Sequence, residues 1–459
     1  MGSIPHSASF PASGPGAQRK VVVVGAGIAG LSAAYRLQEA GCEVVVLEKT
    51  HHVGGRMRTE EKEGYRIDVG AAMLPDTYRE MRGLIHDIGM TNQIVPSGDV
   101  YGLLRKGRVH RIGRNVGRDL LRTGLLSICG KLRLLRLVAD AGRVGGRLNF
   151  RDLSEAYEAD EACTAYSSRR LSREIFDYVI EPLCTNYFFS APEELSMAHI
   201  FPAVRETIGT GYFSSPAGVG FLPRGLAERL DIRFGTPVTL LEEHRDGVTV
   251  TVEGPDGRQR RETAPACVLA VTGASVPEVW PGVPAGMRTY LSRLRYATCV
   301  HVSFGISSRP AEPAMWILVP RREFPGGMGV CLDHNRAPGR APEGKGMISV
   351  YWATERSEEM YDLDDEEIVE AALRDLERVS LFPGVRNQVE MTHVSRCRPC
   401  VPLLHAGSIA ELRNGLAGLP STSRVALAGD FFAIGSTNAA LTSGEAAASR
   451  VLALLDHTR

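Results

Sequence analysis

The sequence has no excess of either charge: its 459 residues include 53 lysines and arginines and 53 aspartates and glutamates. It also lacks any run of about 18 apolar residues, the length that a membrane-spanning helix needs. The balanced overall charge says nothing about partners, and we expect no membrane span; no nucleic-acid partner is expected either. What is present is a 44% share of hydrophobic residues in a chain long enough for two or three domains with separate cores.

The cysteines do not form the regular set of a secreted disulfide framework. There are nine, and they are scattered, so reduced thiols in the cytoplasm are expected. Cys397 and Cys400 form the single CxxC motif; without a second one a four-cysteine zinc site is excluded, and we expect no metal. The pair has either a redox or covalent role, or that of ordinary buried thiols. Residues 1–19 lack a signal-peptide pattern and are predicted to be a disordered tail.

The N-terminal part of the sequence predicts a βαβ unit. Residues 20–24 are a β-branched run, as expected of a strand buried on both faces of a parallel sheet. Helix-forming residues follow over 31–40, and a second apolar strand is expected over 43–47. A strand, a glycine-rich turn, a helix and a second strand in this order are typical of a dinucleotide-binding domain.

Gly25, Gly27 and Gly30 form a GxGxxG motif in this unit. Gly25 permits a tight turn, Gly27 lets the backbone approach a diphosphate, and Gly30 lets helix and strand pack closely. The diphosphate then lies at the positive end of the helix dipole. Glu48 ends the second strand, where a carboxylate accepts hydrogen bonds from a ribose diol and repels a 2′-phosphate, which disfavours NADP.

Two further motifs favour FAD over a nicotinamide cofactor. A Gly-Gly-Arg sequence ends at Arg56, where a longer cofactor would continue past its diphosphate and the guanidinium would neutralise phosphate charge. Near the C-terminus, a strand over 424–428 is followed by Asp430 and then by a helix over 443–455. Asp430 is expected to hold a ribityl hydroxyl. The N-terminus of the following helix is expected to face the flavin N1–C2=O edge, which becomes negative on reduction.

These motifs resemble those of the large FAD-dependent superfamily that contains protoporphyrinogen oxidases, flavin amine oxidases and phytoene desaturases. The layout is most similar to protoporphyrinogen oxidases, because residues 181–196 resemble their helical-domain signature. The resemblance covers most of the chain and is carried by residues 21–59, 68–71, 235–238, 268–272, 295–304 and 429–444.

The resemblance implies FAD as the cofactor and assigns a set of residues to it. These are Gly25, Gly27, Ile28, Ala29, Gly30, Glu48, Lys49, Gly54, Gly55, Arg56, Gly70, Ala71, Ala72, Met73, Val238, Gly429, Asp430, Thr437, Asn438, Ala439 and Leu441. The expected chemistry is hydride transfer from a small-molecule substrate to flavin N5, with O2 as the electron acceptor.

The positions expected to face the substrate differ from the family pattern. Where amine oxidases usually carry a lysine, this chain has His301, which either holds a water or acts as a base, or is a packed strand histidine. Leu404 replaces the tyrosine of a Pro-x-Tyr-x-x-Gly pattern, and Ser408 replaces a histidine common in protoporphyrinogen oxidases. Leu404, His405 and Phe431 are the expected substrate-pocket residues, although Phe431 is also typical of a core.

The predicted architecture is α/β: a two-dinucleotide-binding-type, Rossmann-like FAD domain, a mixed-sheet substrate domain and a helical subdomain. The FAD domain is discontinuous and comprises residues 20–79, 218–285 and 422–459. The helical subdomain comprises residues 80–217, and the substrate domain comprises residues 286–421.

Basic residues are concentrated in residues 105–151, where only Asp119 and Asp140 oppose them and leucines interleave. A basic helix with an apolar face is typical of a helix on an anionic membrane, or of one that guides an anionic or greasy substrate. The alternative is a solvated helix whose leucines pack on the core. The acidic stretch 355–377 could balance this charge within the protein or across a homodimer.

Three functions remain open at this point. The first is an oxidase or desaturase that removes hydride from an apolar or polycyclic small molecule in a biosynthetic pathway, including a protoporphyrinogen- or coproporphyrinogen-type oxidase. The second is a flavin amine oxidase. The third is a non-catalytic relative similar to GDP-dissociation inhibitors of small GTPases, against which the intact cofactor motifs argue. We expect a cytoplasmic enzyme, peripheral to a membrane if the basic segment makes a lipid contact.

Overall fold

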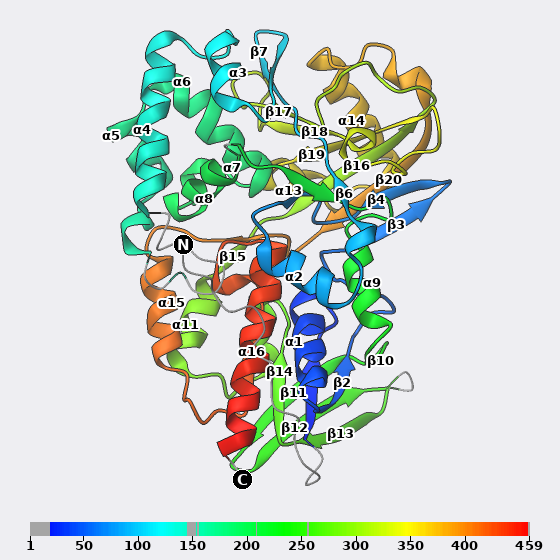
Figure 1. The fold of residues 1–459 in the computed structure, drawn as a ribbon, viewed down its shortest axis with the longest axis vertical. Helices are drawn as coiled ribbons and strands as arrows, with labels where there is room; N and C mark the ends of the chain where they lie inside the picture. Colours follow the sequence, from blue (N-terminus) through cyan, green and yellow to red (C-terminus); the bar gives the residue numbers. More distant parts are fainter. Residues whose placement is uncertain (1–18, 145–152, 154–155, 208, 255–256, 458–459) are drawn as a thin grey trace.

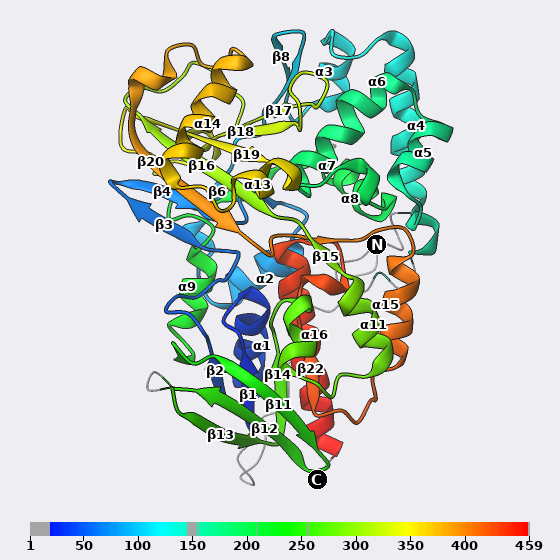
Figure 2. The ribbon, with the colours of Figure 1, turned by 180° about the vertical axis from the view of Figure 1, so that it is seen from behind.

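The structure is a computed structural model that describes residues 19–144, 153, 156–207, 209–254 and 257–457. The predicted tail lies outside the described residues except for Arg19, and residues 145–151 of the basic segment lie outside them as well. Figures 1 and 2 show an elongated molecule, with a parallel sheet toward one end of its long axis and a larger mixed sheet and a group of helices toward the other.

The parallel sheet combines segments from the beginning, the middle and the end of the chain. Its five strands run in the order β10-β2-β1-β14-β22, and every neighbouring pair is parallel. The β-branched run of β1 is buried on both faces, as predicted. The α/β class with a Rossmann-like sheet is therefore confirmed. The strands are β1 (Lys20–Val24), β2 (Glu43–Leu47), β10 (Asp231–Arg233), β14 (Ala266–Leu269) and β22 (Val425–Leu427).

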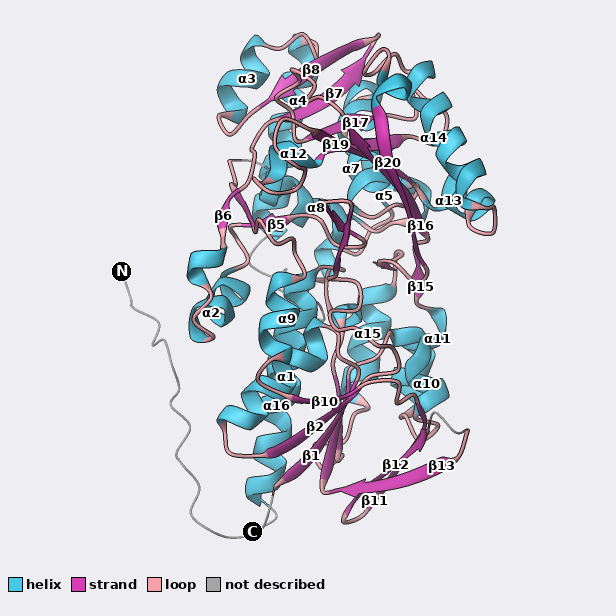
Figure 3. Cartoon of the chain, turned by 90° about the vertical axis from the view of Figure 1, so that its right-hand side faces the viewer, coloured by secondary structure: helices cyan, strands magenta, loops and turns pink. Residues whose placement is uncertain are grey.

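Two helices pack side by side against this sheet: α1 (Ile28–Glu39) and α16 (Thr437–His457). A Cβ placed on Gly444 would lie 2.1 Å from the Ala29 carbonyl oxygen, so the two helices approach more closely than a larger residue would allow. Figure 3 shows these helices on one side of the sheet and a three-stranded antiparallel sheet on the other. Its strands are β11 (Val238–His244), β12 (Gly247–Glu253) and β13 (Gln259–Ala264).

The last helix begins earlier than the sequence predicted. We expected it over 443–455, but α16 begins at Thr437. The Ser436 hydroxyl accepts a hydrogen bond from the Ala439 amide at 3.1 Å and so caps the first turn. The start of this helix thereby comes close to the end of β22.

The larger sheet has seven strands in the order β20-β16-β19-β18-β17-β7-β8, with β17 and β7 parallel and the other pairs antiparallel. Strand β16 is buried at every position and lies between β20 and β19. The strands are β7 (Tyr101–Arg105), β8 (Arg108–Ile112), β16 (Cys299–Ile306), β17 (Trp316–Val319), β18 (Met328–Leu332), β19 (Gly346–Trp352) and β20 (Val389–Cys397).

Residues 80–217 are less helical than predicted. They contribute the β7–β8 hairpin to the seven-stranded sheet, because Lys106 and Gly107 both adopt a positive φ and close a two-residue turn. The basic segment is therefore not one helix but a hairpin followed by two helices. The helices of this part are α2 (Arg79–Asp87), α3 (Val116–Arg122), α4 (Ile128–Val144), α5 (Cys163–Arg170), α6 (Arg173–Ile175), α7 (Glu181–Tyr187) and α8 (Met197–Thr207).

Shorter elements connect these parts of the fold. The remaining strands are β3 (Thr59–Lys62), β4 (Tyr65–Asp68), β5 (Leu74–Pro75), β6 (Val95–Pro96), β9 (Tyr212–Ser214), β15 (Arg295–Tyr296) and β21 (Pro402–Leu403). The remaining helices are α9 (Phe221–Ala227), α10 (Val276–Val279), α11 (Ala285–Arg293), α12 (Asp333–Arg336), α13 (Thr354–Met360), α14 (Asp365–Arg378) and α15 (Ser408–Ala417). None of the described helices is both long enough and apolar enough to cross a membrane.

Candidate functional site

A cavity of about 830 Å³ lies between the parallel sheet and the seven-stranded sheet. Val24 and Leu47, the last residues of β1 and β2, line it, so it opens at the carboxyl ends of parallel strands, where α/β sheets bind ligands. The cavity has two halves. The cofactor half is lined by residues between 24 and 78, between 236 and 279 and between 429 and 440, and the aromatic half by residues of the helical part and of strands β7, β17 and β19. Residues 396–401, at the end of β20 and directly after it, also line the cavity, and we call them the rim.

The three glycines of the GxGxxG motif differ in what surrounds them. Gly25 has a φ of +100°, and a Cβ there would lie 2.6 Å from the Ala270 carbonyl oxygen. A Cβ on Gly30 would lie 1.9 Å from the Gly25 carbonyl oxygen, so Gly30 is required by the fold of the turn itself. A Cβ on Gly27, which lines the cavity, would meet nothing within 4 Å. The space beside Gly27 is thus available to a ligand.

Glu48 is held rigidly at the end of β2. One carboxylate oxygen accepts a hydrogen bond from the Ala26 amide at 2.8 Å. The other oxygen accepts from the Thr50 amide at 2.9 Å and from its hydroxyl at 2.8 Å. The carboxylate is oriented before any ligand binds, and Glu48 lines the cavity, as a ribose-binding acid must.

Arg56 and Asp430 join the two motifs that the sequence placed at opposite ends of the chain. The guanidinium donates to both carboxylate oxygens, at 2.7 and 2.9 Å, and also to the Cys400 carbonyl oxygen at 2.6 Å. Burial opposes the positive charge, but the carboxylate outweighs it and leaves the pKa of Arg56 above its ordinary value. The two residues, expected to act separately on phosphate and ribityl groups, form one bidentate pair.

A buried ion network supports the loop of residues 70–73, which lines the cavity. The Asp68 carboxylate, at the end of β4, lies 2.7 Å from the Arg340 guanidinium and 3.0 Å from that of Arg336. Burial alone would raise the pKa of Asp68, but the two arginines hold it below its ordinary value. Arg336 also donates to the Ala72 carbonyl oxygen at 2.5 Å and so fixes the loop directly.

The residues of the cofactor half fit FAD. Gly27 leaves space for a diphosphate, Glu48 offers oriented acceptors for a ribose, and the N-terminus of α16 supplies a positive dipole end. The buried Thr437 hydroxyl lines the cavity at this terminus and has no hydrogen-bond partner among the described residues. An orphaned hydroxyl at the positive end of a helix suits the polar edge of a flavin.

Most residues that the sequence assigned to the cofactor line the cavity. These are Gly25, Gly27, Ile28, Ala29, Glu48, Lys49, Gly54, Gly55, Arg56, Gly70, Ala71, Ala72, Met73, Val238, Gly429, Asp430 and Thr437. The structure places Gly30, Asn438, Ala439 and Leu441 behind this surface. The Asn438 side chain, for example, accepts a hydrogen bond from the Met81 amide at 3.1 Å and donates to Glu80.

The aromatic half is built by residues that sequence reasoning did not assign to it. Its walls include Tyr101, Asn186, Tyr187, Phe188, Phe189, Trp316 and Tyr351. The Trp316 and Tyr351 ring centroids are 4.9 Å apart, and the Tyr187 hydroxyl donates to that of Tyr101 at 3.3 Å. The segment 181–196 was noted only as a family signature. Nothing in it shows that the residues after α7 turn toward a cavity.

The charged groups of the cavity wall belong to the cofactor half and its rim. They are Glu48, Lys49, Arg56, Glu278, Arg396, Arg398 and Asp430. The Arg396 guanidinium is paired with Asp365 at 2.7 Å, and that of Arg398 lies 3.9 Å from the centre of the Tyr361 ring. Among the described lining residues, the aromatic half therefore offers rings, hydroxyls and one amide, but no lysine, arginine or carboxylate.

His301 lies behind the cavity wall rather than in it. Its ring stacks on Tyr351 with centroids 4.5 Å apart and an angle of 19° between the planes. Burial lowers its pKa to about 4, and Nε2 has no hydrogen-bond partner among the described residues. The ring is neutral, and it supports the aromatic residue that lines the cavity.

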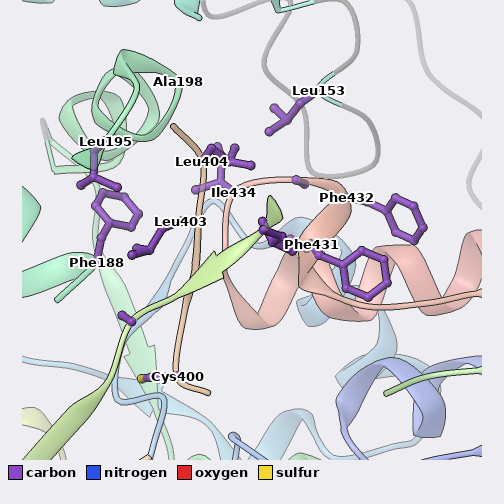
Figure 4. Packing of buried hydrophobic residues seen from close by; sticks show 14 of the residues in the cluster. Leu153, Phe188, Leu195, Ala198, Cys400, Leu403, Leu404, Phe431, Phe432 and Ile434 are labelled. Atoms are coloured by element: carbon purple, nitrogen blue, oxygen red, sulfur yellow. The ribbon is translucent and has the colours of Figure 1, made fainter. Parts of the chain in front are cut away.

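The three expected substrate-pocket residues do not line the cavity either. Leu404 and Phe431 are buried in the main hydrophobic cluster, and Figure 4 shows both among its side chains. The Leu404 amide donates to His199 Nε2 at 2.8 Å. The His405 side chain is half-buried, and its Nδ1 lies 2.9 Å from the Ser408 hydroxyl at the start of α15. None of the three is among the residues that line the cavity, and their role in a substrate pocket stays a prediction.

The chain belongs to the family of flavin containing amine oxidoreductases, whose family model matches residues 28–452. Among curated relatives, coproporphyrinogen III oxidase of Bacillus subtilis (strain 168) is 25% identical over 87% of this chain and 91% of its own length. An L-amino-acid oxidase of Vipera ammodytes ammodytes is 26% identical over 69% of this chain and 70% of its own length.

Among solved structures, cyclohexylamine oxidase from Brevibacterium oxydans has the same fold, with a TM-score of 0.77 and 19% identity over 96% of this chain and all of the other. The protein is an FAD-dependent oxidoreductase. FAD supplies a hydride acceptor when it is bound.

Proposed function

We propose that this enzyme oxidises a neutral, largely apolar, ring-containing small molecule by removing a hydride, with O2 as the final electron acceptor. The observation that supports this most directly is the uncharged aromatic half of the cavity. Rings such as those of Trp316 and Tyr351 contribute large apolar contact areas and fix the plane of a flat substrate.

The polar groups of the aromatic half orient the substrate and do not ionise. Burial raises the pKa of Tyr101 and of Tyr351 well above the ordinary value, so both phenols are neutral at physiological pH. Asn186 is already held by a hydrogen bond from the Trp316 indole at 3.3 Å. The walls must hold one C–H bond about 3–3.5 Å from the acceptor atom and exclude water, which needs no strong base.

The substrates of the named relatives make a useful contrast. Coproporphyrinogen and L-amino acids carry carboxylates, whose burial requires cationic partners. The described residues of the aromatic half provide none, and both rim arginines are engaged elsewhere. We therefore favour a substrate without carboxylates over a porphyrinogen.

A flavin amine oxidase is the second candidate, and one observation favours it. Trp316, Tyr351 and Phe189 form a cluster of rings, and the faces of such rings attract a cation. Against it, the described aromatic half has no carboxylate to hold an ammonium group. The two candidate functions thus differ in the charge of the substrate, which a panel of compounds can test.

Anaerobic reduction of the bound flavin by added compounds tests the proposal. A panel would contain neutral polycyclic compounds, primary and secondary amines, porphyrinogens and L-amino acids, matched in concentration. We expect the absorbance of the oxidised flavin to be lost only with members of the neutral class, and to return on admission of O2. Bleaching by a porphyrinogen or an amino acid at a comparable rate would refute the proposal, and bleaching by amines alone would establish the second candidate.

We also propose a cytoplasmic location. All nine cysteines are unpaired in the structure, as expected of a protein in a reducing compartment.

A further inference from the structure

Four of the seven large hydrophobic side chains that are exposed in the described chain lie within fifteen residues of one another. They are Leu121 (78% exposed), Ile128 (79%), Leu132 (64%) and Leu135 (64%). Such a concentration of exposed apolar side chains is unusual on a folded protein and marks a surface that binds something. The views in Figures 1 and 2 agree that α4 lies at the outer edge of the helical part.

Helix α4 has two apolar faces, and one of them packs against the core. Leu137 and Ala141 are fully buried on the inner face. Ile128, Leu132 and Leu135 follow the i, i+4, i+7 spacing and therefore form one stripe on the opposite, exposed face. The sequence offered packing on the core as one explanation of the leucines in this segment, and that packing explains only the inner face of α4.

The exposed stripe is flanked by arginines that have no carboxylate partner among the described residues. Arg133 and Arg136 lie beside it on α4, and Arg118 and Arg122 lie on α3, all of them exposed. No carboxylate of the described residues lies within 4.0 Å of these four side chains, whereas Arg143 at the end of α4 is paired with an aspartate. We name Leu121, Arg122, Ile128, Leu132, Arg133, Leu135 and Arg136 the α4 surface.

We propose that the α4 surface docks on the anionic headgroups of a lipid bilayer, with its leucines inserted at the interface. Apolar side chains between arginines are the pattern of a helix that lies in the plane of a membrane. The two kinds of contact reinforce each other, because arginines attract anionic lipids and leucines gain from entering the acyl boundary. A second copy of this chain is a poorer occupant, since a symmetric contact would bring like charges together.

The position of the α4 surface links this docking to the cavity. Helix α4 packs on α8, and Pro202 and Ala203 of α8 line the cavity. Only helices α4 and α8 therefore lie between the docked face and this part of the cavity wall. If the substrate is apolar, as proposed above, it would enter from the bilayer. The docking itself does not depend on that proposal, because it rests on α3 and α4 alone.

Vesicle co-sedimentation of the FAD-loaded enzyme tests the docking. The vesicles are phosphatidylcholine alone, or phosphatidylcholine with phosphatidylglycerol. We expect binding to the anionic vesicles and little to the neutral ones. Raising the salt from about 0.1 M to about 1 M should weaken the binding, because it shortens the screening length from about 10 Å to about 3 Å.

Two double variants separate the contributions of the α4 surface. Arg133→Gln with Arg136→Gln should lower the partition constant about 25-fold, since each arginine near an anionic surface contributes about fivefold. Leu132→Gln with Leu135→Gln should also abolish most binding but leave the weak attraction that salt removes. Leu363→Gln and Arg374→Gln, exposed residues outside the surface, are the matched controls and should bind as the unaltered protein does.

The vesicle experiment measures binding alone, so it does not require the oxidase activity to be known. Each variant must keep its flavin content and melting temperature, which we expect because all four substituted side chains are exposed. Equal partitioning of the variants and the unaltered protein, or no binding to anionic vesicles at low salt, would overturn the proposal. A dimer in solution that Leu132→Gln with Leu135→Gln dissociates would assign the α4 surface to a second copy instead.

Discussion

Arg56 and Asp430 are 374 positions apart in the sequence, yet the guanidinium and the carboxylate face each other through two hydrogen bonds of 2.7 and 2.9 Å. One residue follows β2 and the other follows β22, so the pair connects the two ends of the chain across the cofactor half of the cavity. Loss of either partner would leave the other without its bidentate contact in the wall of the cavity.

We therefore expect Asp430→Asn to lower both stability and flavin content. The substitution leaves the Arg56 charge without its partner in a cavity wall. Because the Arg56 side chain retains 31% exposure, the loss in the free energy of unfolding should be about 1–3 kcal/mol. Urea denaturation and the ratio of flavin to protein absorbance measure the two effects. Arg56→Lys keeps the charge but not the two-pronged contact, and a variant that retained full flavin and stability would contradict this role.

Substitution of Gly27 and of Gly30 by alanine should separate cofactor binding from folding. The Gly27 Cβ would meet no protein atom within 4 Å, so Gly27→Ala should fold normally but lose FAD, because its methyl group fills the diphosphate space. The Gly30 Cβ would lie 1.9 Å from a backbone oxygen, so Gly30→Ala should be destabilised with or without flavin. Melting curves of flavin-free protein distinguish the two. A Gly27→Ala protein with stoichiometric FAD would show that the diphosphate lies elsewhere.

Trp316 is expected to contribute to substrate binding more than to the chemical step. Trp316→Leu removes an aromatic wall of the cavity, so KM should rise by about tenfold or more while kcat changes less, since ring contacts present before reaction are lost equally in the transition state. Trp316→Phe keeps a ring and should show a smaller rise. Phe234→Leu, at an exposed aromatic position, is the control. An unchanged KM in both Trp316 variants would place the substrate outside the aromatic half.

The cofactor half was more predictable from the sequence than the aromatic half, and the reason is physical. The roles of Gly27 and Glu48 follow from local geometry, a turn between a strand and a helix and the end of the next strand, which neighbouring residues specify. The aromatic half brings together Tyr101, Asn186 and Tyr351 from three distant segments, so only the tertiary fold defines it. His301 was placed by family pattern on the correct strand, but it lies behind Tyr351.

Cys129 should be the one rapidly reacting thiol of the nine. It is exposed on α4, whereas the hydrogen bond with Cys400, together with burial, raises the pKa of the Cys397 thiol well above the ordinary value. A thiol must ionise to react, so the CxxC pair should be labelled slowly at neutral pH. Ellman's reagent should show one fast equivalent, and Cys129→Ser should remove it. A second fast equivalent that Cys397→Ser abolishes would favour a redox or covalent role for the pair.

His301 should make the folded state sensitive to acid. Its pKa is lowered by burial to about 4 in the folded protein, against an ordinary value of about 6.5 in the unfolded chain. Between these values the unfolded chain binds more protons, so stability is fully present above pH 6.5 and is lost as the pH falls toward 4. His301 alone should lower the free energy of unfolding by roughly 3 kcal/mol between pH 6.5 and pH 4, because each pKa unit corresponds to about 1.4 kcal/mol. His199, whose pKa burial lowers to about 3, acts in the same direction.

Urea denaturation of His301→Phe at several pH values measures this contribution. The phenyl ring can still stack on Tyr351 but cannot take up a proton, so the dependence of stability on pH between 6.5 and 4 should become shallower while the part due to His199 remains. His86→Gln, at an exposed position on α2, is the control. If stability depends on pH equally in His301→Phe and in the unaltered protein, the imidazole takes up its proton in the folded protein as it does in the unfolded chain. A role of His301 as a catalytic base would then have to be considered again.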